Sequence, residues 1–195
     1  MLNFYQEIKL LPEEEIPIHF LWSKVIGQIH LGLVEMQDEN KLAPIGVSFP
    51  GYVTGEKHSV LGDKCRLFAV DEATLAQFNA AKWLARLTDY VHCTSLRPVP
   101  EKLNGYALFQ REQPKASIER LARRYARHHN VDYESALKRY SNTPHKIMSS
   151  PFIRLKSLSS DKTFCLWIKK TNIPKPQGNV FSSYGLSATS TVPDF

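Results

Sequence analysis

The sequence predicts a mixed α+β protein with two parts, and three observations support this prediction. In the first hundred residues, apolar positions switch between strand-like and helix-like spacing. Prolines and N-capping residues divide these stretches into short elements. The two halves also differ in charge, because residues 1–100 hold 9 Lys and Arg against 12 Asp and Glu, whereas residues 101–195 hold 16 against 7.

The composition is that of an ordinary folded protein. The chain has 195 residues, 43% hydrophobic and 23% charged, which excludes a disordered chain, a collagen and a coiled coil. One domain or two small ones fit this length. No apolar run approaches the ~20 residues of a membrane helix, and the N-terminal stretch has no signal-peptide pattern. Cys65, Cys93 and Cys165 are far apart, which indicates neither a disulfide framework nor a zinc site. We therefore expect a reduced, cytoplasmic protein.

The first hundred residues are expected to contain six elements. In chain order these are a strand at 4–10, a helix at 17–37, strands at 45–50 and 61–70, a helix at 72–87 and a strand at 91–98. The helix at 72–87 follows Asp71, a good N-cap. The order β-α-β-β-α-β is that of a ferredoxin-like unit. It fills about half of the chain, so a domain boundary is predicted near residue 100, with domains at 1–100 and 101–195.

The second half is predicted to form a smaller, basic α+β domain. Its elements are a strand at 105–110, a helix at 117–129 with Ser117 as N-cap, a short helix at 133–141, a β-hairpin with strands at 152–159 and 163–170, a loop at 171–181 and a last strand at 182–187. Its net charge of +9 suggests a polyanionic partner, of which nucleic acid is the first candidate. A solvated basic surface is the alternative.

The helix at 117–129 is the strongest local indication of a nucleic-acid site. Four arginines share one of its faces, with a histidine at the edge: Arg120, Arg123, Arg124, Arg127 and His128. Three larger side chains lie opposite and can pack on the domain: Ile118, Leu121 and Tyr125. Arginine binds phosphates in bidentate fashion and hydrogen-bonds to guanine edges. RNA or DNA binding is therefore favoured over a solvated helix face.

Candidates for catalysis are weaker on their own. His30 lies at the border of the apolar face of the helix at 17–37, beside Ser23 and Gly27 on neighbouring turns. A histidine can act as a general base near neutral pH, but a packed or surface histidine is the commoner case. Ser157 and Ser159 are predicted to share one face of a hairpin strand, where an ordinary strand edge explains them equally well. No histidine or carboxylate spacing indicates a metal site.

Taken together, five segments resemble one family. They are IGQIHLGL around His30, IGVSFP at 45–50, the arginine helix, PFIRLKSLSS at 151–160, and SSYGLS together with the terminal VPDF. The chain resembles the CRISPR-associated repeat-processing endoribonuclease of the subtype I-F system, within the RAMP superfamily. The resemblance covers essentially the whole chain, and it implies a ferredoxin-like N-terminal domain.

The resemblance also implies a function. Family members bind a stem-loop in the CRISPR repeat and cut the precursor RNA at the 3′ base of the stem, without a metal or other cofactor. They then stay on the 3′ hairpin of the mature guide RNA as a subunit of the surveillance complex. The ends expected after cleavage are a 2′,3′-cyclic phosphate or 3′-phosphate and a 5′-hydroxyl. The resemblance implies no membrane partner and no requirement for self-association.

The resemblance assigns a role to individual residues. His30 matches the catalytic histidine, Ser157 the serine that positions the ribose 2′-hydroxyl, Ser159 a supporting serine, and Tyr184 a tyrosine that orients the site. The matching RNA-binding residues are Arg111 and Gln113, which read base edges of the lower stem, Phe164, which packs on the terminal base pair, and Arg123, Arg124 and Arg127 of the groove-inserting helix. Charge and position add Lys115, Arg120 and His128 to the predicted RNA-binding residues, although His128 stands where the family commonly has a further arginine. Two alternatives stay open: a non-catalytic hairpin-binding subunit, and a metal-dependent nuclease, which the lack of a carboxylate–histidine cluster disfavours.

Overall fold

The computed structural model describes residues 1–55, 58–113, 118–140, 148–157 and 160–195. It is a mixed α+β structure, which confirms that prediction. The chain divides into two compact units, one made of Met1–Glu112 with Ser150–Phe195 and the other of Gln113–Ser149. This division differs from the boundary predicted near residue 100.

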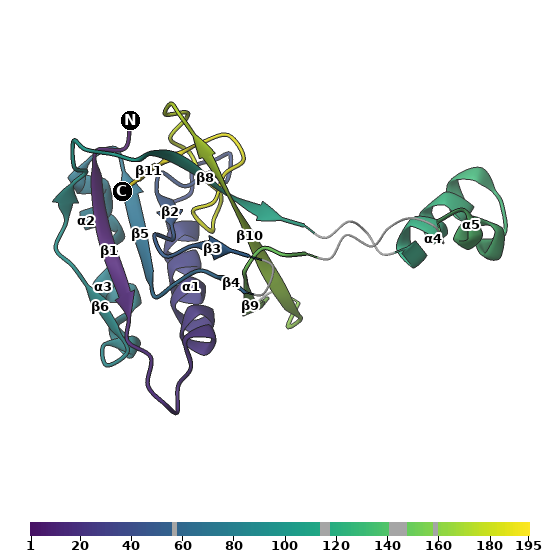
Figure 1. Cartoon of the computed structure of the whole chain (residues 1–195), viewed down its shortest axis with the longest axis horizontal. Helices are drawn as coiled ribbons and strands as arrows, with labels where there is room; N and C mark the ends of the chain where they lie inside the picture. The colour runs from purple at the N-terminus through teal and green to yellow at the C-terminus, as the bar shows by residue number, and fades with distance from the viewer. Residues whose placement is uncertain (56–57, 114–117, 141–147, 158–159) are drawn as a thin grey trace. The chain divides into compact units, whose positions relative to one another are not determined.

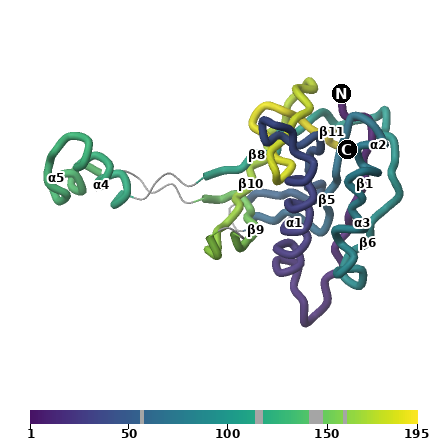
Figure 2. Tube along the Cα trace, turned by 180° about the vertical axis from the view of Figure 1, so that it is seen from behind, coloured from purple at the N-terminus to yellow at the C-terminus, as the bar shows by residue number. Residues whose placement is uncertain are grey.

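The first part of the first unit is a β-sheet with helices packed on one of its faces. Its antiparallel order is β2 (Gly46–Ser48), β5 (Lys64–Ala69), β1 (Phe4–Leu10) and β6 (Val91–Cys93), and β7 (Arg97–Pro98) also pairs with β1. Figures 1 and 2, seen from opposite sides, show α1 (Ile18–Glu35) and α2 (Glu72–Phe78) on the same face of this sheet. Side chains alternate along β1, so Ile8 and Leu10 are buried and Lys9 is exposed. A small hairpin, β3 (Val53–Thr54) with β4 (Ser59–Val60), lies between β2 and β5 along the chain.

The first helix forms where its apolar residues recur at helical spacing. Pro17 occupies its N-cap, and the buried side chains include Trp22, Ile26, Ile29 and Leu33. This stripe faces the core, and burial of each large side chain contributes about 1.5–3 kcal/mol. The helix lies within the predicted range 17–37 and leaves its opposite face for other contacts.

The helix predicted at 72–87 is broken into three pieces. They are α2, α3 (Ala80–Trp83) and the 3₁₀ helix η1 (Ala85–Leu87). Asp71 caps α2 as predicted, because its carboxylate accepts the Thr74 backbone N–H at 2.8 Å. The break comes at Asn79, whose φ of 50° is left-handed and ends α2. Asn tolerates this conformation better than most residues, a signal that the helix-period reading overlooked.

A second sheet completes the first unit. Its order is β11 (Val192–Asp194), β8 (Gly105–Glu112), β10 (Thr163–Ile173) and β9 (Phe152–Lys156), all antiparallel. The predicted hairpin is present as the β9–β10 pair, but β9 ends at Lys156. The strand predicted at 182–187 is wrong, since these residues form a turn with Gly185 at φ 68°. The terminal strand β11 was not predicted, because Pro193 weakens a strand pattern.

The two sheets share one hydrophobic core. The Phe49 ring lies 5.4 Å from the Trp22 ring of α1 and 5.7 Å from the Phe109 ring of β8, measured between centroids. Ile153 of β9 and Ile168 of β10 are buried in the same core. The second-half strands therefore complete the core of the first-half elements, which is why the compact units do not separate at residue 100.

The second unit is a helical hairpin of α4 (Ile118–His129) and α5 (Tyr133–Tyr140). Ala122 and Ala136 are fully buried in it, and the Tyr125 ring packs edge-on against the Tyr140 ring at 6.0 Å. Asn130 has a left-handed φ of 51° just after α4, as expected for a helix C-terminus. The predicted N-cap, Ser117, lies outside the described residues. Across the described ranges, no helix is long and apolar enough to cross a membrane.

Candidate active site

The candidate catalytic residue His30 sits on α1 next to open space. Ser23, Gly27 and His30 lie on one helix face, because residues three, four and seven apart fall on the same side. A Cβ atom built at Gly27 would meet nothing within 4 Å. His30 itself is half-buried. The missing side chain at Gly27 thus leaves room beside the imidazole, as the sequence predicts.

Two groups from a distant segment hold the His30 ring. Its Nδ1 lies 2.9 Å from the carbonyl oxygen of Ser183. A carbonyl only accepts, so Nδ1 donates its hydrogen and, in the neutral ring, Nε2 is the basic nitrogen. The Tyr184 ring stacks on the imidazole at a centroid distance of 4.2 Å and an interplanar angle of 7°. The ring is therefore fixed in both tautomer and plane.

The segment that contributes these groups is a tight turn tied to both sheets. The Gly185 N–H donates to the Ser182 carbonyl at 2.8 Å, and the Gly185 carbonyl accepts the Val47 N–H of β2 at 2.8 Å. The Ser187 N–H donates to the Phe109 carbonyl of β8 at 2.9 Å. The IGVSFP and SSYGLS motifs, far apart along the chain, are thus joined by a direct hydrogen bond between Val47 and Gly185.

Arg111 of β8 contacts Phe164 of the neighbouring strand β10. Its guanidinium lies over the Phe164 ring, 5.5 Å from the centroid. Burial raises the pKa of Tyr184, and the positive charge of Arg111 acts in the opposite direction, which couples the two side chains electrostatically. The structure therefore brings the predicted residues together as two contacting pairs, His30 with Tyr184 and Arg111 with Phe164.

Ser157 lies one residue beyond the end of β9, and the shared face predicted for Ser157 and Ser159 stays a prediction. The Ser157 N–H donates to the Lys162 carbonyl at 2.9 Å, and the Ser160 hydroxyl donates to Ser157 Oγ at 2.9 Å. β9 packs beside α1, where the Ser23 hydroxyl donates to the Arg154 carbonyl at 2.6 Å. Ser159 lies outside the described residues.

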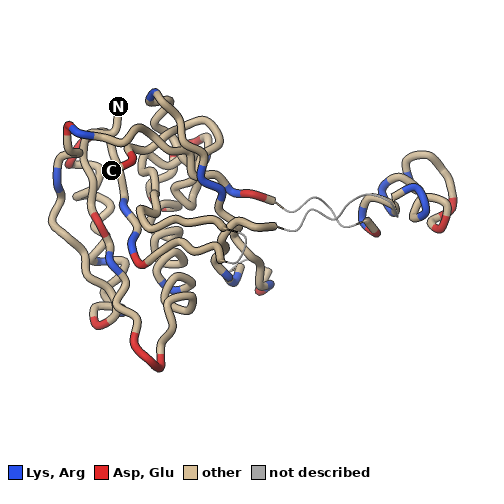
Figure 3. The backbone as a smooth tube through the Cα atoms, in the orientation of Figure 1, with Lys and Arg blue, Asp and Glu red and all other residues tan. Residues whose placement is uncertain are grey.

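The second unit carries the predicted basic face. Five exposed side chains of α4 line one surface hollow: Arg120, Arg123, Arg124, Arg127 and His128. Figure 3 shows the basic positions of this helix. Gln113 is exposed and belongs to the same unit, whereas Lys115 lies outside the described residues. The spacing along the helix thus predicts the shared face correctly, while the role of these residues in binding stays a prediction.

Two contributors to the site could not be predicted from the sequence. The Ser183 carbonyl acts through the backbone, so its residue type carries no signal. The link between Ser23 and β9 also depends on a strand 131 residues away. Across the described ranges, no three His, Cys, Asp or Glu side chains form a group that could hold a metal ion.

Comparison with known proteins relates the whole chain to one family. A family model described as "CRISPR-associated protein (Cas_Csy4)" matches residues 5–195. The chain is 34% identical over 197 residues to the "CRISPR-associated endonuclease Cas6/Csy4" of Escherichia coli (strain UTI89 / UPEC), with 100% of both chains covered. It is 33% identical over 196 residues to the protein of the same name from Pseudomonas aeruginosa (strain UCBPP-PA14), again with 100% of both covered.

One solved structure is more remote. It is described as "An RAMP protein binding different RNA substrates" and covers 98% of this chain and 100% of its own, with 10% identity and a TM-score of 0.31. That likeness is too weak to support any argument about the fold. The two relatives and the match over residues 5–195 are sufficient, and they confirm the resemblance found in the sequence: the chain belongs to the Cas_Csy4 family of CRISPR-associated proteins.

Proposed function

We propose that this protein is an endoribonuclease that binds the stem-loop of a CRISPR repeat and cleaves the precursor RNA at the 3′ base of the stem. The observation that carries the proposal is the state of His30. Its Nδ1 donates to the Ser183 carbonyl and its ring stacks on Tyr184, which leaves Nε2 as a basic nitrogen in a fixed position. The two relatives are named CRISPR-associated endonucleases, which agrees with this activity.

RNA supplies its own nucleophile, so the protein needs only to align and deprotonate it. In the proposed reaction, Nε2 of His30 takes the proton of the ribose 2′-hydroxyl. The 2′-oxygen then attacks the adjacent phosphorus, the bond from phosphorus to the 5′-oxygen breaks, and the 5′-oxygen gains a proton from solvent. The products are a 2′,3′-cyclic phosphate, which opens to a 3′-phosphate with water, and a 5′-hydroxyl.

The other site residues are assigned to positioning. Ser157 aligns the ribose, with Ser159 in support, and Tyr184 restrains the imidazole through the stack at 4.2 Å. Phe164 packs on the terminal base pair, and Arg111, which already lies over that ring at 5.5 Å, reads a base edge beside it. Gln113 reads the neighbouring pair.

The arginine helix is assigned to the stem. A duplex groove presents phosphates on both sides, and the exposed face of α4 matches them with a row of guanidinium groups. Lys115 and His128 extend this row in the proposal. The enzyme stays on the 3′ hairpin after cleavage, as a cytoplasmic subunit of the type I-F surveillance complex, and requires neither a metal nor self-association.

The architecture proposed for this activity places β1, α1, β2, β5, α2 and β6, within residues 1–100, in a ferredoxin-like unit. The observed strand order β2-β5-β1-β6 and the two helices on one face support it. Residues 101–195 then contribute the RNA-binding elements. The catalytic histidine comes from the first part and most RNA contacts from the second.

Cleavage of a repeat hairpin in EDTA tests the proposal. We expect the hairpin to be cut at one position both with and without the chelator. A hairpin with a deoxyribose at that position should still bind to the protein but should not be cut. Loss of activity in EDTA would show a metal-dependent nuclease. Binding without cleavage of the all-ribose hairpin would show a non-catalytic hairpin-binding subunit.

A further inference from the structure

A pocket of about 840 Å³ lies in the first unit, between the start of α1, the β4–β5 segment and the start of β9. We call it the α1–β9 pocket. The residues that matter for its chemistry are Phe20, Ser23, Val60, Asp63, Phe152 and Arg154. None of them belongs to the predicted site.

The walls of the pocket are mainly apolar and include two exposed aromatic rings. Phe20 is 48% and Phe152 43% exposed, an unusual exposure for side chains of this size. Three polar residues also line it: Asp63, Arg154 and Ser23, whose hydroxyl donates to the Arg154 carbonyl at 2.6 Å. Apolar walls with a small number of polar groups are typical of sites for planar organic groups, including nucleobases.

The pocket and His30 are reached from the same face of α1. Phe20, Ser23, Gly27 and His30 follow one another along a single face of α1. Seven residues of helix separate Ser23 from His30, a rise of about 10 Å that a short single strand can bridge. The intervening position is Gly27, beside which a Cβ would meet nothing within 4 Å. β9 packs on the same helix at Ser23, whose hydroxyl donates to the Arg154 carbonyl at 2.6 Å, so a strand leaving His30 would run past Gly27 and then beside β9 to reach the pocket.

We propose that the α1–β9 pocket binds the unpaired nucleotides immediately 3′ of the cleaved phosphate. This inference rests on the proposed function, which puts the cut at the 3′ base of the stem. The nucleotide before the cut then belongs to the stem, so the single strand that begins at the cleaved phosphate is the downstream one. It is therefore the strand closest to His30.

Each wall has a defined task in this proposal. Phe20 and Phe152 stack on bases, which tolerates any base because each has a π-face. Arg154 binds a phosphate of the same strand. Asp63 accepts a hydrogen bond from the exocyclic amine of A, C or G, which favours these bases over U. The pocket would thus hold the substrate's downstream strand and release it after cleavage.

The test compares two hairpins with a deoxyribose at the cut, one ending just beyond the cleaved phosphate and one with four further 3′ nucleotides. We expect the wild-type protein to bind the longer RNA at least about fivefold more tightly, the lower range for a base stacked on an aromatic ring. Phe20→Ala, Phe152→Ala and Arg154→Ala should each reduce this ratio towards one, without weakening the short hairpin.

Controls separate the possible failures. Arg86→Ala removes an exposed cation on η1, outside the pocket, and should keep the wild-type ratio. If all three pocket variants keep the wild-type ratio of affinities for the long and short RNAs, with unchanged melting temperatures, the inference is overturned. An apolar protein segment would then be the better candidate for the pocket. The inference would also be overturned if affinity rose on adding nucleotides to the 5′ side of the hairpin and not on adding them to the 3′ side. If the wild-type protein fails to cut an all-ribose hairpin, the proposed function fails, whatever the binding ratio.

Discussion

The Ser183 carbonyl accepts a hydrogen bond from Nδ1 of His30, and the Tyr184 ring stacks on the imidazole. These contacts predict how variants of His30 behave. We expect His30→Ala to bind the repeat hairpin with near wild-type affinity and to lose cleavage by about 10²–10⁴-fold, the usual contribution of a general base. Single-turnover cleavage and hairpin binding measure the two effects. His92→Ala, an exposed histidine on β6, is the matched control. Comparable cleavage by His30→Ala would remove the histidine from the mechanism, and lost binding would make its role structural.

Tyr184 acts on His30 through its ring, so its variants should differ from one another. The stack at 4.2 Å uses the ring face, which phenylalanine also offers. We expect Tyr184→Phe to slow cleavage only a few-fold and Tyr184→Ala to slow it further, while both stay above His30→Ala. Ser157→Ala should slow cleavage with unchanged melting. Equal rates for Tyr184→Phe and Tyr184→Ala would contradict a role for stacking.

At the scale of elements, the turn at Gly185 positions the groups that hold His30. Gly185 has a φ of 68°, and a Cβ there would lie 2.2 Å from Val47 Cγ2. We therefore expect Gly185→Ala to destabilise the protein by more than about 1 kcal/mol and to reduce cleavage, because the turn must leave β2. Urea unfolding and single-turnover cleavage measure the two effects.

Gly27→Ala is the matched substitution on α1. Here the backbone is helical and the added methyl meets no atom within 4 Å, so alanine should stabilise the protein by about 0.5–1 kcal/mol. The two alanine substitutions should therefore change the free energy of unfolding in opposite directions in the same urea experiment. A stabilising Gly185→Ala would show that the turn is not fixed by its contact with β2.

The arginine helix makes a prediction about salt. Each phosphate contact contributes a slope of about −0.7 to −0.9 to the logarithm of affinity against the logarithm of salt concentration. Arg124→Ala and Arg127→Ala should each lower the slope by about one contact. Arg111→Ala should instead reduce the affinity for the cognate stem more than the affinity for a stem with a changed closing pair. An unchanged slope would mean that α4 faces solvent in the complex.

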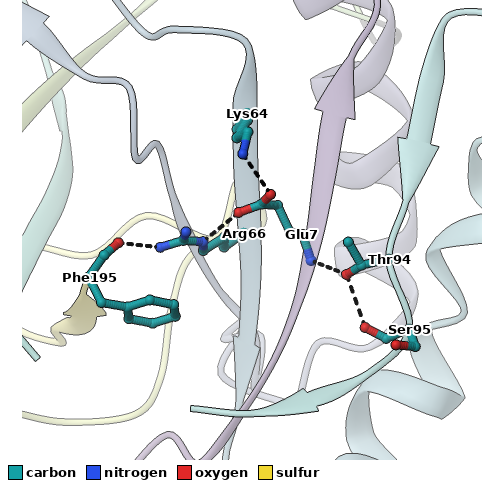
Figure 4. A network of polar contacts seen from close by, with 6 residues as sticks. All are labelled: Glu7, Lys64, Arg66, Thr94, Ser95 and Phe195. Atoms are coloured by element: carbon teal, nitrogen blue, oxygen red, sulfur yellow. Dashed lines mark hydrogen bonds and ion pairs between the residues drawn. The ribbon is translucent and has the colours of Figure 1, made fainter. Parts of the chain in front are cut away.

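At the scale of the whole molecule, one polar network joins the first strand to the last residue. Glu7 of β1 pairs with Lys64 at 3.0 Å and with Arg66 at 2.8 Å, both on β5. Arg66 hydrogen-bonds to the Phe195 carbonyl and lies over its ring at 4.1 Å. Figure 4 shows these residues together. The two ends of the chain are thereby fixed to the same sheet.

This network predicts a pH dependence of stability. Burial raises the pKa of Glu7, but the hydrogen bonds and charges of Lys64 and Arg66 outweigh it, so the pKa lies below its ordinary value of 4.5. The stabilisation is complete above that value and is lost as the pH falls through the lower pKa of the folded state. Glu7→Gln should therefore melt lower than wild type at pH 7, with a smaller difference near pH 3. A difference independent of pH, or one matched by the exposed Glu35→Gln, would contradict this.

Local patterns were sufficient to predict much of the fold. Apolar spacing predicts α1 and β10, and the capping carboxylate of Asp71 marks the start of α2. Patterns failed where a single backbone conformation decides the outcome. Asn79 breaks a helix that its apolar spacing favours, and Gly185 turns a segment that reads as a strand. The Asn79 conformation is a local property that apolar spacing does not register, whereas the turn at Gly185 is held by the contact with Val47, far away in the sequence.

The sequence by itself determined the mixed α+β class, the shared face of the arginines on α4 and, through its motifs, the family of the chain. Only the tertiary structure decided that the second-half strands share a core with the first half. It also brought the Ser183 carbonyl and the Tyr184 ring to His30, 153 and 154 positions away. The physical reason is that helical spacing is a local property of the chain. The tautomer of an imidazole depends instead on a backbone carbonyl, which any residue type can provide.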